Sequence, residues 1–416
     1  MRPSTLLVLG LGFAGGILLG GCGVSPGPKP TTAASAVPLA PSSTPVIGCS
    51  AVTTEPTPTG STQLTTVSAA DYTRGPATAD VTLLYYCDFQ SVQCELFNQV
   101  LDQLVADHPG DLKVVMRPFA VPVSVVPSLD KSELAARATL AAGRQGKFWQ
   151  MRDLLHAKYE QWTQLAPDKF GTWLVGQTSE LGLDEQQFDT DLSSKAIADQ
   201  ASEIYDSATT AGISGIPTVF INGRLQERAA LSHEGLQSTI ALLALGSKQF
   251  KSCPPFEVDS SRQYTAVLHT SKGDVVIQLY AAEAPLAVNS FVYLARQHWF
   301  DGVTFHRVIP GFVAQAGDPS GTGRGGPGYI FDNEIQPDLL FDKPGVVGMA
   351  NSGPDTNGSQ FFITYSPQPQ LDGGYTVFGQ VAAGIDVVRN LTPRDPQSGG
   401  DLPAGDRILS ITIEEH

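Results

Sequence analysis

Apolar residues follow two different patterns along the chain, and the change between them separates two folded regions. Residues 81–86 and 112–117 are apolar-rich runs of the length expected for buried strands. Apolar positions recur at helical spacing after Ser91 and again through 134–156 and 184–210. Strands that alternate with helices predict an α/β domain.

A second pattern occupies the C-terminal part of the chain. Residues 266–270 and 275–280 flank a turn at 271–274, which predicts a β-hairpin. Residues 285–296 have helical periodicity, and short strands with Gly-rich connections continue beyond them. This region is predicted to be mainly β.

Changes in composition set the boundaries of the predicted units. Segments crowded with Pro, Ser, Thr and Gly bury too little apolar surface to offset the entropy lost on ordering. The units are a signal at 1–22, a spacer at 23–66, the α/β domain at 67–248, a linker at 249–262 and the β domain at 263–416.

The charge balance excludes some partners. The chain has 416 residues, a formal net charge of −15 and a hydrophobic content of 42%. Such a chain can form buried cores, but it lacks the basic face that nucleic acid requires. No nucleic acid partner, cofactor or metal is expected, and the sequence does not indicate the oligomeric state.

The N-terminus has the pattern of an export signal. Arg2 precedes an apolar run at 6–19, which is shorter than the ~20 residues of a spanning helix. Gly20-Gly21-Cys22 follows, and the whole order resembles a bacterial lipoprotein signal. The resemblance implies an acylated Cys22 and an extracytoplasmic protein anchored to the bacterial cell membrane. The alternatives are a non-lipidated secretory signal and a short anchor helix.

Three segments of the β region carry the most specific signal. They are Phe305 to Asp318, Met349 to Pro354 and Asn357 to Ile363. Their order resembles the active-site signature of cyclophilins, the peptidyl-prolyl cis-trans isomerases. The resemblance implies a closed antiparallel barrel of eight strands capped by two helices, and an activity on proline-containing polypeptides.

The residue types in these segments fit that reaction. An X-Pro amide resists rotation by ~18–20 kcal/mol, so a catalyst must favour the twisted amide over both planar forms. Arg307 is a permanent cation that can donate to the amide nitrogen or orient the substrate backbone. No covalent intermediate is needed.

The resemblance also assigns roles to individual residues. Those implied to line the proline pocket are Phe312, Val313, Phe362 and Leu371; those implied to hold the peptide backbone are Gln315 and Asn351; Ala350 shapes the adjoining surface; and Tyr375 offers a ring and a hydroxyl. Val313 stands where many members have methionine, and Tyr375 where histidine is common. Gln370 stands where members that bind cyclosporin strongly have tryptophan, which affects drug binding more than catalysis.

Three other motifs are interpreted without a function. Residues 321–326 match G-x-G-x-x-G, but no buried strand precedes them and no helix follows, so they predict a loop and not a dinucleotide site. Asn357 and Asn390 begin glycosylation-type triplets, although the first belongs to the cyclophilin signature. His306 has no metal-ligand partner at a suitable spacing and is interpreted as structural.

Two segments of the α/β region, 86–94 and 212–223, resemble the DsbA-like branch of the thioredoxin fold. That branch has a helical segment inserted between the two halves of the fold. The family expects Cys-x-x-Cys at a helix start, whereas here Ser91 replaces the first cysteine and Cys94 is the second. Pro217 fits the family's cis-proline, so we expect a cis bond before it and a peptide-contacting surface around it.

Two interpretations of this motif stay open. Serine has no comparable thiolate and cannot form a disulfide, which favours a redox-inactive domain that binds client chains. The alternative is a thiol site in which Cys94 pairs with Cys87 or exchanges against it.

The remaining cysteines suggest a structural disulfide. Apart from Cys22 there are four, which allow three connectivities. We favour a bond between Cys49 and Cys253, which flank the α/β domain, because oxidising surroundings permit disulfides. Closing a loop of about 200 residues would stabilise the fold by roughly 3–5 kcal/mol. Two unpaired thiols are the alternative.

Together these features predict a lipid-anchored, extracytoplasmic folding factor. Its β domain would isomerise prolyl bonds, and its thioredoxin-like domain would gather or present client chains. The alternative functions are a non-catalytic peptide-binding chaperone or scaffold, and a thiol-disulfide oxidoreductase that uses Cys94.

Overall fold

The structure is a computed structural model that describes residues 48–52, 62–398 and 402–416. The predicted signal with Cys22, and most of the predicted spacer, lie outside the described residues. Within the described ranges, no helix combines the length and the apolar character needed to cross a membrane.

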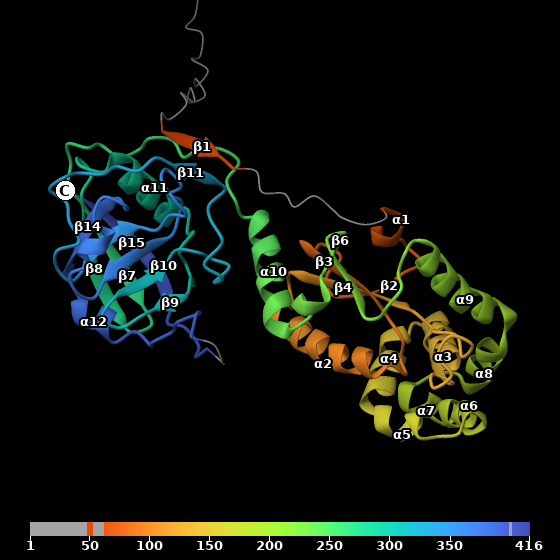
Figure 1. The fold of residues 1–416 in the computed structure, drawn as a ribbon. Coiled ribbons are helices and arrows are strands. Elements are labelled where there is room, and N and C mark those ends of the chain that lie inside the picture. The colour runs from red at the N-terminus through yellow and green to blue at the C-terminus, as the bar shows by residue number, and fades with distance from the viewer. Residues whose placement is uncertain (1–47, 53–61, 399–401) are drawn as a thin grey trace, which may run out of the picture. The chain divides into compact units, whose positions relative to one another are not determined.

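The α/β domain is built on a mixed five-stranded sheet (Figure 1). Its strands, in spatial order, are β2 (Tyr72–Arg74), β4 (Leu112–Pro118), β3 (Val81–Cys87), β5 (Thr218–Ile221) and β6 (Arg224–Leu225). The pair β3 and β4 is parallel, and the other pairs are antiparallel. The two predicted strands are therefore the parallel neighbours β3 and β4.

Helices precede, follow and interrupt this sheet. Those of the described part are α1 (Thr62–Thr65), α2 (Val92–Asp107), α3 (Ser132–Arg144), α4 (Phe148–Ala157), α5 (Tyr159–Thr163), α6 (Pro167–Gly176), α7 (Thr178–Leu181), α8 (Glu185–Ser193), α9 (Lys195–Thr210) and α10 (His233–Gly246), with a 3-10 turn at Arg228–Ala230. The predicted helical stretch 184–210 is divided at Ser194, because its hydroxyl accepts the Ile197 N–H and caps the start of α9.

Both faces of the central strand β3 are buried. Leu83 and Tyr85 belong to the core that also contains Phe97 of α2 and Ile240 of α10. Leu84 lies on the opposite face, in a smaller core with residues of α1 and α9. A strand covered on both faces reads as a continuous apolar run, which is why the sequence shows no alternation there.

The β domain contains a curled eight-stranded antiparallel sheet. Its strands, in spatial order, are β15 (Ile408–Glu415), β7 (Tyr264–Thr270), β8 (Gly273–Leu279), β14 (Val377–Ala383), β12 (Val346–Met349), β13 (Phe361–Thr364), β10 (Val313–Ala316) and β9 (Arg307–Val308). The sheet is open, whereas the sequence predicted a closed barrel. No continuous strand ladder closes it: β9 and the loop before it meet the chain on the far side through isolated bridges, Thr304 to Arg407 and Val308 to Arg394, and through backbone hydrogen bonds such as that from the Phe305 N–H to the Asp406 carbonyl oxygen.

One long helix packs on this sheet. It is α11 (Pro285–Arg296), which has the bounds that the sequence predicted. The Phe291 ring lies at its centre, 5.4 Å from both the Phe361 and the Phe378 rings. The shorter helical segments are α12 (Ile385–Arg389) and a 3-10 turn at Pro369–Leu371. The structure does not confirm the predicted pair of capping helices on a closed barrel.

Parts of the predicted spacer and linker join the β domain. Strand β1 (Cys49–Ala51) pairs with β11 (Tyr329–Phe331). The predicted disulfide between Cys49 and Cys253 is present and spans 204 positions. The Phe250 ring packs 5.2 Å from that of Tyr293. We call residues 48–52 and 249–253, joined by this disulfide, the collar.

Candidate functional site

Strand pairing brings two of the three signature segments onto neighbouring strands. Arg307 on β9 lies opposite Gln315 on β10, and Gln315 lies opposite Phe362 on β13. The third segment joins them next to β12, where the Ala350 N–H donates to the Gln360 carbonyl oxygen at 2.9 Å.

The apolar residues of these segments form one cluster. Its buried members are Val313, Phe341, Val346, Phe362 and Val377, and its half-buried members include Phe312, Ala350, Leu371 and Tyr375. The Phe362 ring meets that of Tyr375 edge to face at 5.5 Å. Six of the residues assigned by the cyclophilin resemblance thus share one apolar surface. Phe341, stacked on Phe362 at 5.4 Å, was not singled out from the sequence.

The Arg307 guanidinium lies at the edge of this surface. Its Cζ is 5.3 Å from the centroid of the Phe312 ring, an arrangement that favours the cation. Among the described residues, no carboxylate forms an ion pair with Arg307, and no hydrogen bond of its side chain is found. The guanidinium donors can therefore bond to a substrate that lies over the apolar cluster.

Two amide side chains are held beside the cluster. Gln315 Nε2 donates to Gln360 Oε1 at 3.0 Å, so the side-chain oxygen Oε1 of Gln315 can accept a hydrogen bond from a peptide N–H. Asn351 Nδ2 donates to the Gly374 carbonyl oxygen at 3.2 Å. The sequence had assigned no role to Gln360, because its function is to orient Gln315 and is visible only after folding.

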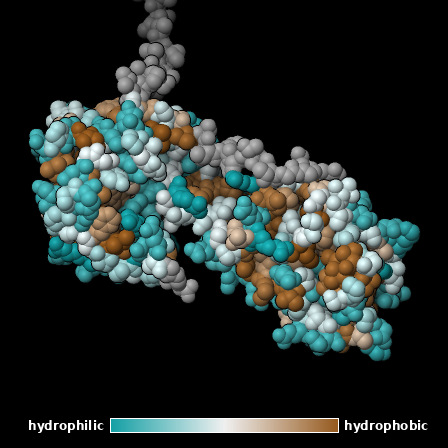
Figure 2. All heavy atoms as spheres, in the orientation of Figure 1, coloured by the Kyte–Doolittle hydropathy of each residue, from teal (hydrophilic) through white to brown (hydrophobic). Residues whose placement is uncertain are grey.

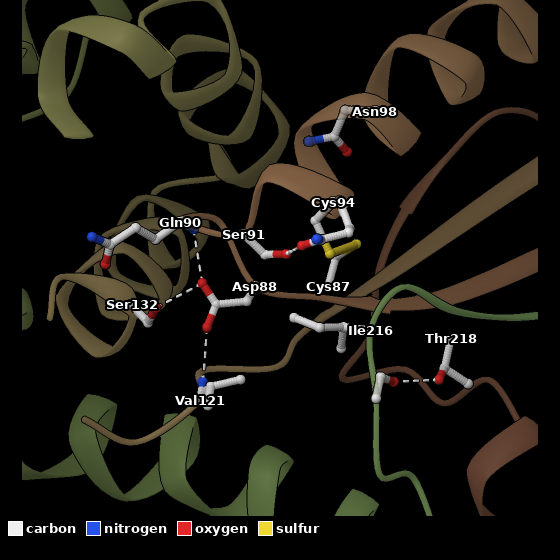
Figure 3. The surroundings of a disulfide bond; sticks show 12 residues. Cys87, Asp88, Gln90, Ser91, Cys94, Asn98, Val121, Ser132, Ile216 and Thr218 are labelled. Carbon is white, nitrogen blue, oxygen red and sulfur yellow. Dashed lines mark hydrogen bonds between the residues drawn. A yellow bond between two sulfur atoms is a disulfide. The ribbon is translucent and has the colours of Figure 1, made fainter. Parts of the chain in front are cut away.

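The thioredoxin-like motif contains a second disulfide, shown in Figure 3. Cys87 at the end of β3 is bonded to Cys94 in the first turn of α2, and each cysteine is only 1% exposed. Ser91 is the N-cap residue of α2, and its hydroxyl donates to Gln93 Oε1 at 3.1 Å. The bond before Pro217 is cis, as predicted. The pairing named in the thiol interpretation is present, whereas exchange remains a prediction.

A buried carboxylate lies next to this disulfide. Asp88 Oδ1 accepts from the Ser132 hydroxyl at 2.7 Å and from the Gln90 N–H at 2.8 Å, while Oδ2 accepts from the Val121 N–H at 2.8 Å (Figure 3). Burial raises the pKa of Asp88, although these hydrogen bonds oppose the shift. The carboxylate thus joins the loop after β3 to two other segments. In the described ranges, no group of three or more His, Cys, Asp or Glu could hold a metal ion.

Comparison with known proteins finds both domains. The family of cyclophilin type peptidyl-prolyl cis-trans isomerases matches residues 265–413, and a thioredoxin family matches residues 68–241. A peptidyl-prolyl cis-trans isomerase of Schizosaccharomyces pombe is 51% identical over 127 residues, which cover 30% of this chain and 82% of that protein. Peptidyl-prolyl cis-trans isomerase A of Mycobacterium tuberculosis is 46% identical over 167 residues, covering 36% of this chain and 91% of that protein. The chain belongs to the cyclophilin family.

The β domain is therefore a cyclophilin-type peptidyl-prolyl cis-trans isomerase, and the α/β domain has a thioredoxin fold. A solved cyclophilin type isomerase from Cryptosporidium parvum is 37% identical, covers 37% of this chain and 98% of that one, and has a TM-score of 0.34.

Two positions differ from the residues that the cyclophilin resemblance leads us to expect, Gln370 and Tyr375. Gln370, which replaces tryptophan, donates through Nε2 to Gln368 Oε1 at 2.6 Å. Tyr375, which replaces histidine, packs edge to face on Phe362.

His306 lies directly before Arg307 and is 4% exposed. Burial lowers the pKa of His306; the Arg307 and Arg394 cations act in the same direction, and the Asp318 carboxylate opposes them. The folded protein therefore favours a neutral imidazole.

This shift predicts a loss of stability in acid. The unfolded His306 titrates near ~6.5, so its contribution is fully present above that pH and is lost as the pH falls towards the lower folded pKa. The urea midpoint at which isomerase activity is lost should therefore fall more steeply between pH 7.5 and pH 5.5 in the wild type than in His306→Asn.

The control for this prediction is His416→Gln, because the His416 side chain is 56% exposed. This variant should keep the pH dependence of the wild type. Equal pH dependence in His306→Asn and the wild type would contradict the prediction.

Proposed function

We propose that this chain is an extracytoplasmic, lipid-anchored folding factor that isomerises X-Pro bonds of client polypeptides. The observation that carries the catalytic part is the Arg307 guanidinium, which lies over the Phe312 ring beside an apolar cluster and has no carboxylate partner among the described residues.

The geometry suggests how the barrier is lowered. The apolar cluster takes the proline ring out of water, and Gln315 and Asn351 hold the peptide backbone on one side of it. The Arg307 guanidinium then donates to the amide nitrogen, which becomes a better acceptor as the amide twists. Because this hydrogen bond is stronger in the twisted state than in either planar state, it accelerates the rotation.

Arg307→Ala should lower kcat/KM by about ten- to hundredfold, the range expected for one charge-assisted hydrogen bond. A protease-coupled prolyl assay on the full chain measures this effect. Arg389→Ala is the matched control, because Arg389 lies in α12 of the same domain and is 48% exposed. Equal rates for Arg307→Ala and the wild type would instead favour a non-catalytic peptide-binding scaffold.

We further infer that the thioredoxin-like domain belongs to the DsbA-like branch and is redox-inactive. The helical segment from α3 to α9 between β4 and β5 supports the first point. Ser91 at the start of α2, together with the burial of both Cys87 and Cys94, supports the second. Thiol exchange requires a sulfur that a partner can reach, and the sulfur atoms of Cys87 and Cys94 are both buried.

The surface of this domain favours peptide binding as its role. On α2, close to Ser91, Val92 and Leu96 are 57% and 58% exposed. Val123 and Val125, in the segment that follows β4, are 56% and 60% exposed. Hydrophobic residues gather on the face of the α/β domain that Figure 2 shows. Exposed apolar side chains of this size are typical of protein-contacting surfaces.

A redox-inactive domain should not reduce insulin. In the presence of dithiothreitol, neither the full chain nor its Cys87→Ser/Cys94→Ser variant should make insulin precipitate faster than dithiothreitol alone does. Thiol counting by mass, without reductant, should find no free thiol at Cys87 or Cys94. Insulin reduction by the wild type that the double variant lacks would establish the oxidoreductase alternative.

Membrane attachment is proposed from the signal-like N-terminus. After expression in a bacterium fed with a labelled fatty acid, the wild type should carry label and sediment with membranes. Cys22→Ser should carry no label and should leave the membrane fraction, because one acylated residue supplies the anchor. An unlabelled wild-type protein would rule out the lipoprotein assignment in that host.

A further inference from the structure

The Gly-rich loop at 321–326, which matches a dinucleotide motif only by its spacing, lines a pocket beside the isomerase site. This pocket has a volume of about 410 Å³, and Gln315, Ala350 and Asn351 from the site form part of its lining. Val52 and Gln249, which lie outside the segment that matches the cyclophilin family, line it as well. The collar thus contributes to a cavity that opens next to the assigned substrate residues.

The collar is docked on this loop by polar contacts. Gln249 Nε2 donates to the Gly326 carbonyl oxygen at 2.9 Å. The backbone N–H groups of Phe250 and Val52 donate to the carbonyl oxygens of Pro327 and Gly328 at 2.9 Å and 2.8 Å. These bonds fix residues on both sides of the disulfide against the same loop.

Gly328 shows that the loop accommodates the collar closely. Its φ is +90°, and a Cβ at this position would lie 2.3 Å from the carbonyl oxygen of Phe250. Any larger residue would displace the linker backbone, because such a contact is far shorter than atoms tolerate.

A chain of hydrogen bonds connects this loop with the isomerase site. Gln360 Nε2 donates to the carbonyl oxygens of Gly323 and Gly325 at 3.0 Å and 2.9 Å, and Gln360 Oε1 accepts from Gln315. The loop that holds Gln249 therefore also orients Gln315. A change in the collar can reach the substrate residues through this loop.

We propose that two residues of the collar, Val52 and Gln249, are part of the substrate site. Gln249 and Val52 form the outer wall of a subsite for a client side chain near the isomerising X-Pro bond, and the Cys49–Cys253 disulfide keeps that wall in place. Of the described residues that line this pocket, Arg324 is the one with a charged side chain, and it is exposed, so the subsite favours an acidic side chain. This inference rests on the isomerase activity of the domain.

The test compares kcat and KM of the full chain on proline peptides that carry alanine, glutamate or lysine beside an Ala-Pro core. The wild type should have a lower KM for the glutamate peptide. Gln249→Ala should raise that KM by about two- to tenfold with kcat unchanged, as expected when uniform binding is lost. Cys49→Ser/Cys253→Ser should have the same effect, because the wall is then no longer held.

Lys251→Ala is the matched control, because Lys251 is an exposed residue of the same linker that does not line the pocket. It should match the wild type on every peptide. If the KM values of Gln249→Ala equalled those of the wild type, the proposal would be overturned, whether or not the double cysteine variant folds. A fall in kcat on all peptides would also overturn it, since that result places the effect in the catalytic residues. An inactive wild type would instead refute the isomerase function.

Discussion

In the proposed mechanism, isomerisation depends on one cation, Arg307, that lies beside an apolar surface and has no carboxylate partner among the described residues. A guanidinium normally finds a carboxylate, particularly in a chain with a net charge of −15. Here the pairing of β9 with β10 places Arg307 opposite Gln315, and the neighbouring Phe312 presents a ring to it. A ring attracts the cation without satisfying its hydrogen-bond donors, so these remain for the substrate.

The thioredoxin-like domain has a buried disulfide at the motif where the resemblance expects a reactive thiol. Ser91 stands where the resemblance expects an exposed thiol, and the disulfide formed by Cys87 and Cys94, on either side of it in the sequence, is buried in the core. Asp88 ties the loop between them to the segments that contain Val121 and Ser132. The disulfide and these hydrogen bonds thus fasten the end of β3 to the start of α2, and the proposed role of this domain is contact with client chains through its surface.

Local sequence signals predicted much of this structure. The apolar run at 81–86 predicted β3, helical spacing predicted α11, and the flanking positions of Cys49 and Cys253 predicted their disulfide. The strand and the helix were predicted from residues that are neighbours in the sequence, and the disulfide was predicted because cysteines outside the cytoplasm usually pair. The open edge of the eight-stranded sheet was not predictable, because it depends on how irregular segments around β9 meet residues about a hundred positions away.

The candidate site shows the same division. The motif order located Arg307 and the residues of the apolar cluster, but it gave no sign of Gln360 or of the collar. Gln249 lies in a segment whose composition predicts a linker, and its place in a cavity wall results from the bond that it forms with Gly326 after folding. Composition reports the average tendency of a segment and cannot report one specific contact.

The disulfide of the collar also changes the connectivity of the whole molecule. The bond between Cys49 and Cys253 closes a covalent ring that contains the α/β domain. Both ends of the α/β domain are therefore covalently connected to the β domain, one through the backbone and one through the disulfide. A protease that cut the backbone once within this ring would leave a nicked molecule of unchanged mass apart from one added water. Its fragments would separate only after the sulfur bridge had been reduced.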